Sequence, residues 1–237
     1  MKKVVFISPV FNSAKHMKDL VNSIKEQTNK NWEHIIIDDM STDNSFSIAH
    51  ELTKNDDRFK LIKNKTRKYA LKNIVEVARR FENENDIIIA IVDGDDALCN
   101  ENTVNILLEA YQEKTDTAWT MHTWDINNIN VSKEMIDNPA VDPYQYPWVS
   151  SHLKTFRSTL IKNISNSNFK NLDNNWFSIG CDQALYIPLL SASRERKFIN
   201  EICYLFRMNS SSVKNRKFSE KEKYNTINLV RARGFLN

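Results

Sequence analysis

The segment IIIAIVDGDDAL, residues 87–98, places three aspartates directly after six apolar residues. They are Asp93, Asp95 and Asp96, with Gly94 between the first two. Because like charges held a few ångströms apart repel and raise one another's pKa, the cluster implies a compensating positive charge. Mg²⁺ and Mn²⁺ bind carboxylate oxygens and keep coordination positions for phosphate oxygens. The segment therefore predicts a site for a divalent ion and a diphosphate.

A structural explanation competes with the metal site, because aspartate is favoured at the N-terminus of a helix. One aspartate is enough for such a cap, whereas this segment has three. An EF-hand loop is excluded because glycine and glutamate do not stand at its sixth and twelfth positions. The G-x-G-x-x-G motif of dehydrogenases and the P-loop are also absent from the sequence.

Alternating apolar runs and helical patterns in the first 125 residues predict an α/β fold. Near-continuous Ile and Val runs are typical of strands buried on both faces of a mostly parallel sheet that is flanked by helices. Ligands bind such sheets beyond the carboxyl ends of the strands, where residues 9–12, 38–39 and 93–96 are expected. The predicted strands are 4–8, 33–38, 59–63, 86–92 and 117–124, and the predicted helices are 13–28, 44–54, 69–82 and 101–113.

The pattern changes after residue 125 to a smaller region of helices and loops. Prolines mark residues 125–148 as a loop, and a second loop is expected over 166–180. The sequence predicts helices over 152–164, 181–193 and 219–233 and one strand over 198–209.

Composition limits the class of protein. No apolar run approaches the roughly 18 residues that span a bilayer, and three cysteines without a CxxC pair indicate reduced thiols, hence a cytoplasmic location. From Arg194 onward the chain carries eleven Lys or Arg and four Glu, a balance of 11 − 4 = +7. This basic C-terminal segment predicts contact with a phosphorylated acceptor or peripheral contact with an anionic membrane; the alternative is a solvated helical face. No nucleic-acid partner is expected.

Four segments, in this order, resemble the family 2 glycosyltransferases, which have the nucleotide-diphospho-sugar transferase (GT-A) fold. They are VVFISPVFN, IIIDDMSTDNS, TRKYALKNIVEVA and IVDGDDAL. The third resembles the segment that precedes the family's fourth strand, and the last matches its D-x-D-D motif. The resemblance covers about residues 1–125.

This resemblance implies a donor site built from the first three segments. Pro9 and Phe11 would line the pocket for uracil or another base, and Asp39 would accept a hydrogen bond from a base N–H. Arg67 matches a position that reaches the base or the diphosphate in related enzymes. For Asp39 the alternative is a helix N-cap, and for Arg67 it is a surface position without a role.

The resemblance also assigns the metal site, which would hold Mn²⁺ or Mg²⁺. Asp95 would ligate the ion, Asp93 would hold the ribose or the ion, and Asp96 is a further candidate ligand.

The second half would bind the acceptor and supply the catalytic base. Asp182, followed by Gln183, resembles the family's base, an acid just before a helix whose dipole favours its charge; the alternative is an N-cap. His152 and Trp176 are further candidates for contact with acceptor or phosphate, as is Gln183. For His152 the alternative is a structural role, and for Trp176 it is a place in the core. The Q-x-x-R-W motif of processive polymerases is missing.

These features predict one domain with two halves: residues 1–125 bind the nucleotide-sugar donor, and residues 126–237, including the basic C-terminal segment, bind the acceptor and carry the base. The expected activity is metal-dependent, inverting transfer of a single sugar from a nucleotide-diphosphate donor, foremost a UDP-sugar, to a hydroxyl of a glycan or glycolipid in surface glycan biosynthesis. One alternative is an inactive sugar- or nucleotide-binding protein of the same fold. A sugar nucleotidyltransferase is the other, but its glycine-rich loop is absent from SPVFNSAKH.

Overall fold

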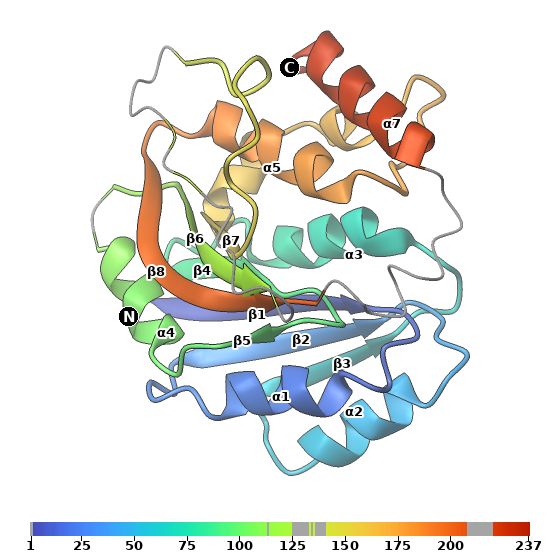
Figure 1. The fold of residues 1–237 in the computed structure, drawn as a ribbon, viewed down its shortest axis with the longest axis vertical. Coiled ribbons are helices and arrows are strands. Elements are labelled where there is room, and N and C mark those ends of the chain that lie inside the picture. The colour runs from blue at the N-terminus through green and yellow to red at the C-terminus, as the bar shows by residue number, and fades with distance from the viewer. Residues whose placement is uncertain (1, 113, 125–132, 134, 136–140, 208–219) are drawn as a thin grey trace.

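The structure, a computed structural model, describes residues 2–112, 114–124, 133, 135, 141–207 and 220–237. Its centre is one eight-stranded sheet with the strand order β3-β2-β1-β4-β7-β6-β8-β5 (Figure 1). The strands are β1 Lys3–Val10, β2 Trp32–Asp38, β3 Phe59–Lys63, β4 Ile87–Ile91, β5 Ala97–Leu98, β6 Thr117–Trp124, β7 Lys154–Arg157 and β8 Arg196–Phe206.

The sheet is mostly parallel, as predicted. Strands β1 to β4 run parallel, with β1 between β2 and β4. β7 is antiparallel to both β4 and β6, while β6 and β8 are parallel to each other. The short β5 closes the far edge by antiparallel pairing with β8. Strands from both predicted halves thus share one sheet, although the division into a donor half and an acceptor half stays a prediction.

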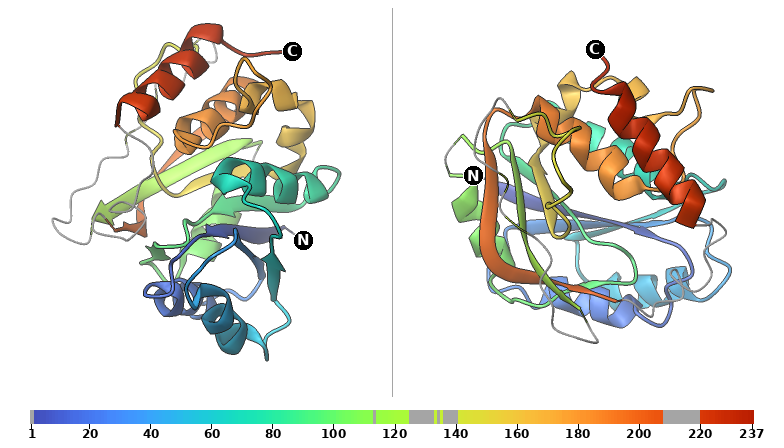
Figure 2. Two further views of the ribbon diagram at one scale, coloured as in Figure 1. Left: turned by 90° about the vertical axis from the view of Figure 1, so that its right-hand side faces the viewer. Right: turned by 45° about the horizontal axis from the view of Figure 1, so that its top comes forward.

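Helices cover both faces of the sheet (Figure 2). Successive side chains of a strand point to opposite faces, so Val4 and Phe6 pack with α1, α2 and α4. Val5 and Ile7 pack on the other face with α3 and α5, and α7 lies against α5. The helices are α1 Met17–Lys25, α2 Ser45–Thr53, α3 Tyr69–Ala78, α4 Thr103–Ala110, α5 Cys181–Ala192 and α7 Glu220–Arg233; 3-10 turns are η1 Arg79–Phe81, η2 Ser158–Asn163 and η3 Asn166–Phe169.

One predicted element is wrong. The segment 152–164 was expected to be helical, but Lys154–Arg157 forms β7 and Ser158–Asn163 a 3-10 turn. Pairing with β4 and β6 on both sides supplies backbone hydrogen bonds that outweigh a local helical pattern. The predicted loop over 125–148 falls largely outside the described residues. Among the described residues, no helix is both long and apolar enough to cross a membrane.

Close packing at Gly94 fixes the acidic turn against the end of β1. A Cβ added to Gly94 would lie 2.8 Å from the carbonyl oxygen of Pro9 and 2.9 Å from Cγ2 of Val10. The first of these atoms is backbone of a central strand and cannot move away easily. The missing side chain therefore lets the turn that carries Asp93 and Asp95 approach β1.

We expect Gly94→Ala to lower the free energy of unfolding by about 1–3 kcal/mol, the usual cost of overpacking, and to speed amide exchange at Asp93 and Asp96. Urea denaturation and hydrogen exchange measure the two effects. Gly234→Ala is the control, because nothing lies within 4 Å of its Cβ position and any cost comes from its φ of +70°. Unchanged exchange in the Gly94 variant would contradict the packing argument.

Candidate active site

The ends of β1, β2 and β4 bring three polar segments to one edge of the sheet. The parallel register pairs Val10 with Asp38 and Ile7 with Ile91. The backbone N–H of Asp39 donates to the carbonyl of Val10, and that of Val92 donates to Ile7. Residues 9–12, 38–39 and 93–96 therefore lie where the sheet predicts a ligand site.

Asp39 is the centre of a first cluster at this edge, and it is 2% exposed. Its Oδ1 accepts from the side chain of Asn64 and the backbone of Lys68, and its Oδ2 accepts from the backbone of Tyr69 and from Nε of Arg67 (3.1 Å). Burial raises the pKa of Asp39, but hydrogen bonds, foremost from the side chain of Asn73 and the backbone of Lys68, outweigh this effect and the net shift is downward. Asp39 thus caps α3, a helix distant in the sequence, and holds Arg67.

Arg67 covers the ring of Phe11. Its guanidinium carbon lies 3.1 Å from the centre of the Phe11 ring and 5.0 Å from that of Tyr69. The structure therefore groups three of the predicted donor-site residues, while Pro9 stands inside β1 next to Gly94. A base stacking on the Arg67 side of the Phe11 ring would first have to displace the guanidinium.

The acidic turn after β4 is held by the end of β8. Asp96 is 1% exposed, and its oxygens accept from the hydroxyl of Tyr204 and the backbone N–H of Arg207, each at 2.8 Å. The same hydroxyl accepts from the backbone N–H of Asp93 (3.1 Å), and the Arg207 side chain donates to the carbonyl of Asp95 (3.0 Å). Both oxygens of Asp96 are thus used within the fold, and its assignment as a metal ligand stays a prediction.

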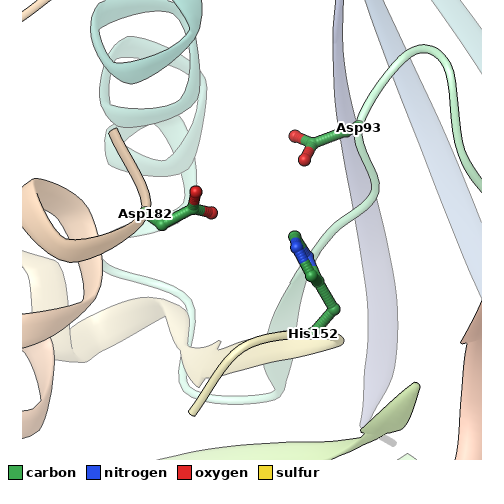
Figure 3. A group of neighbouring side chains, drawn as sticks. All are labelled: Asp93, His152 and Asp182. Carbon is green, nitrogen blue, oxygen red and sulfur yellow. The ribbon is translucent and has the colours of Figure 1, made fainter. Parts of the chain in front are cut away.

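Asp93, His152 and Asp182 converge from three different elements, and their potential ligand atoms all lie within 4.8 Å of one another (Figure 3). Asp93 follows β4, His152 precedes β7, and Asp182 is in the first turn of α5. Burial and the negative charge of Asp182 raise the pKa of Asp93 to about 7. Two carboxylates that face each other so closely are the arrangement that favours a bound cation.

Asp182 forms an ion pair with the side chain of Lys154. Nζ of Lys154 donates to Oδ1 of Asp182 at 2.7 Å, and the Lys154 side chain is only 3% exposed whereas that of Asp182 is 48% exposed. Burial raises the pKa of Asp182, but Lys154 more than reverses this effect, so the pKa lies well below its ordinary value. The N-cap explanation for Asp182 is wrong, because Gly180 occupies that position with a φ of +68°.

His152 is held in a stack of aromatic rings. Its imidazole lies 4.7 Å from the ring of Tyr204 and 5.2 Å from that of Phe206, nearly parallel to both. Burial and the charge of Lys154 push its pKa well below the ordinary value, so the ring is neutral. His152 precedes a strand, rather than the helix that was expected.

A cavity of about 370 Å³ joins these groups. Asp93, Asp95 and Asp182 line it together with His152 and Gln183, whose Oε1 accepts from Arg231 at 2.9 Å. Asp96, Ser151 and Gly180 also line the cavity. The other lining residues are aromatic or basic or come from α7: Trp124, Trp148, Phe206, His122, Arg207, Lys223 and Ile227.

Trp176 is placed elsewhere. Its ring stacks on Phe169 at 6.2 Å, and it is not one of the residues that the structure shows lining the cavity. Residues that sequence reasoning missed are Lys154, Tyr204 and Arg207. A lysine within a central strand could have marked Lys154, but the predicted helix over 152–164 concealed this signal. Tyr204 and Arg207 lie more than 100 residues from the aspartates that they bind, so no local pattern indicates them.

A model of Glycosyl transferase family 2 matches residues 5–173, so the chain belongs to this family. It is 26% identical over 234 residues to glycosyltransferase GlyG of Streptococcus pneumoniae serotype 4. The matched region covers 90% of this chain and 73% of GlyG. It is also 42% identical over 67 residues to the putative glycosyltransferase EpsE of Bacillus subtilis, across 28% of this chain and 24% of that one.

Solved structures confirm the GT-A fold. TarS 1–349 of S. aureus, in complex with UDP, superposes with a TM-score of 0.72 at 20% identity, over 97% of this chain and 64% of that chain. The mannosyltransferase PcManGT of Pyrobaculum calidifontis, in complex with GDP-Man and Mn²⁺, superposes with a TM-score of 0.59 at 14% identity. This match covers 86% of this chain and 56% of that chain. The chain thus spans less than two thirds of either structure.

The raised pKa of Asp93 predicts a pH dependence of stability in metal-free protein. Because the folded pKa of about 7 exceeds the ordinary 3.8, the stabilisation is complete below about pH 4 and is lost as the pH rises through 7. Urea denaturation in EDTA should therefore show wild type losing stability relative to Asp93→Asn between pH 4 and 8. Parallel pH curves for the two proteins would contradict the shift.

Proposed function

We propose that the protein is a metal-dependent, inverting and non-processive glycosyltransferase, which moves one sugar from a nucleotide-diphosphate donor, foremost a UDP-sugar, to an acceptor hydroxyl. The observation that carries the proposal is the pair of carboxylates Asp93 and Asp182 on opposite walls of one cavity. Asp93 belongs to the turn that resembles the family's metal motif, and Asp182 is ionised and half exposed.

Asp182 has the properties of the base. A general base must be ionised at working pH and within reach of the proton that it takes. Lys154 keeps the carboxylate ionised while half of its side chain is open to the cavity. In a single displacement the acceptor hydroxyl attacks the anomeric carbon, the bond from that carbon to the diphosphate oxygen breaks, and the hydroxyl proton passes to Asp182. Attack from the opposite face inverts the configuration.

Asp95 and Asp93 are the residues that would hold Mn²⁺ or Mg²⁺. Both line the cavity from one turn, and carboxylate oxygens suit these ions. The bound ion would supply positive charge to the departing diphosphate. PcManGT in complex with GDP-Man and Mn²⁺ supports this assignment by analogy of fold.

The donor and acceptor assignments have separate support. TarS structures in complex with UDP and with UDP-GlcNAc favour a UDP-sugar, and Phe11, Asp39 and Arg67 are the residues proposed for its base. The aromatic faces of Trp124, Trp148 and Phe206 line the cavity and suit a sugar ring, which favours a glycan or the saccharide of a glycolipid. Surface glycan biosynthesis is the setting that we propose.

Membrane contact through the basic C-terminal segment remains a prediction, and residues 208–219 of that segment lie outside the described residues. Several of its arginines bind within the fold. Arg231 donates to Gln183 and the carbonyls of Tyr144 and Tyr146, and Arg196 donates to the carbonyl of Val141. The balance of +7 therefore exceeds the charge that is open to a surface.

Donor binding can be tested by melting temperature. UDP should raise it more than other nucleotide diphosphates, and only with Mn²⁺ present; at 100 times Kd the stabilisation is about 2.7 kcal/mol. Asp95→Asn should remove the Mn²⁺-dependent part, whereas Asp57→Asn, at an exposed site before β3, should not. A Mn²⁺-dependent shift that persists in Asp95→Asn would contradict the metal assignment.

Asp182→Asn tests catalysis. Asparagine keeps the shape but cannot take a proton, so turnover should fall by about 10²–10⁴-fold while binding of nucleotide and metal is retained. The same assay, run with and without acceptor, separates an enzyme from a binding protein that has lost activity. Near-normal turnover by Asp182→Asn would refute the role of Asp182 as base.

A further inference from the structure

Lys154 is buried in a central strand of the sheet. Strand β7 lies between two other strands, and Lys154 pairs with Ile91 of β4 on one side and with Trp119 of β6 on the other. Ile91 is two residues before Asp93. The ammonium group is therefore carried by the centre of the sheet, at the level where the acidic turn begins.

The Lys154 ammonium has an acceptor for each of its three protons. It donates to the carbonyl oxygen of Ser151 at 2.7 Å and to Oδ1 of Asp182 at 2.7 Å, and it lies 3.2 Å from Nδ1 of His152. An ammonium group offers three donors and no acceptor. One side chain thus ties together the loop before β7, the neutral ring of His152 and the first turn of α5.

These contacts determine which atoms of the neighbours are left for substrates. Because the ammonium can only donate, Nδ1 of His152 accepts, and the proton of its neutral ring is on Nε2. Nδ1 is then not available to a metal ion. Oδ1 of Asp182 is bound to Lys154, which leaves Oδ2 as the oxygen to receive a proton.

Folding stability does not account for a lysine at this position. Removing an ammonium group from water carries a large desolvation penalty. Its partner Asp182 is 48% exposed, so the pair is screened by solvent on one side. Replacing buried ionic groups by apolar ones of similar volume is often neutral or stabilising. The burial of Lys154 is thus explained better by what it does to Asp182.

We propose that Lys154 is a positioning residue for sugar transfer, which acts by holding the Asp182 carboxylate in line with the acceptor hydroxyl. This inference rests on the proposed role of Asp182 as the base. A displacement of about 1 Å in a catalytic group can cost about 10²-fold in rate. Donor binding, which we assign to other residues, does not depend on Lys154.

Lys154→Met should lower kcat by about 10–100-fold, while the Kd of the nucleotide diphosphate and the KM of the acceptor change by less than about threefold. Methionine keeps the length of the side chain without the charge, and Asp182 can be solvated in the variant, so the protein should fold. Lys3→Met is the matched control, because Lys3 also binds a carboxylate, Oε2 of Glu33, at 2.7 Å. It should leave kcat unchanged.

A double-mutant cycle separates positioning from a general effect on the fold. If Lys154 acts through Asp182, adding Lys154→Met to Asp182→Asn should cause no further loss of kcat. An equal loss in both backgrounds, or an unchanged kcat in the single variant, would overturn the inference. If Asp182→Asn alone keeps near-normal turnover, it is the proposed base that fails, and the two failures are thereby distinguished.

Discussion

Repulsion between carboxylates at one edge of the sheet is the constraint on which the site depends. Asp93 and Asp182 come from elements far apart in the chain and face each other across one cavity. The surroundings shift the pKa values of the two carboxyl groups in opposite directions. Lys154 stabilises the ionised form of Asp182, whereas burial and the neighbouring charge raise the pKa of Asp93 to about 7. Two chemically identical groups thereby acquire different properties, which is how paired acids take different roles in one site.

Parallel strands explain why the meeting of three polar segments in the first half could be predicted. Once the Ile-rich runs are recognised as neighbouring parallel strands, their carboxyl ends must meet, and the segments after Val10, Asp38 and Val92 are brought together. No knowledge of side-chain contacts is needed for this step. The hydrophobic pattern and the composition of these runs are enough to predict that the strand ends meet. The family resemblance then gives the individual aspartates their expected roles.

Other parts depend on contacts that no local pattern encodes. Lys154 lies in a segment whose spacing resembles a helix, and only pairing on both sides makes it a strand. Tyr204 and Arg207 reach the acidic turn from more than 100 residues away. The helix N-cap alternative for Asp39 named no helix, and the structure shows that the helix is α3. Trp176 has the chemistry of a sugar-stacking residue, but its position beside Phe169 follows from the packing of its loop.

The residues that line the cavity come from elements of different kinds, one of which is the helix α7 beside Gly180. A side chain at Gly180 would meet Thr226 at 3.2 Å and Ile227 at 3.4 Å, so α7 lies directly on the turn that begins α5. Lys223 and Ile227 of the same helix form part of the wall. Asp93 and Asp95 are carried by the turn after β4 of the central sheet, whereas Lys223 and Ile227 belong to a peripheral helix. Substitutions in α7 can therefore reshape this part of the wall, which we propose for the acceptor, without disturbing the sheet.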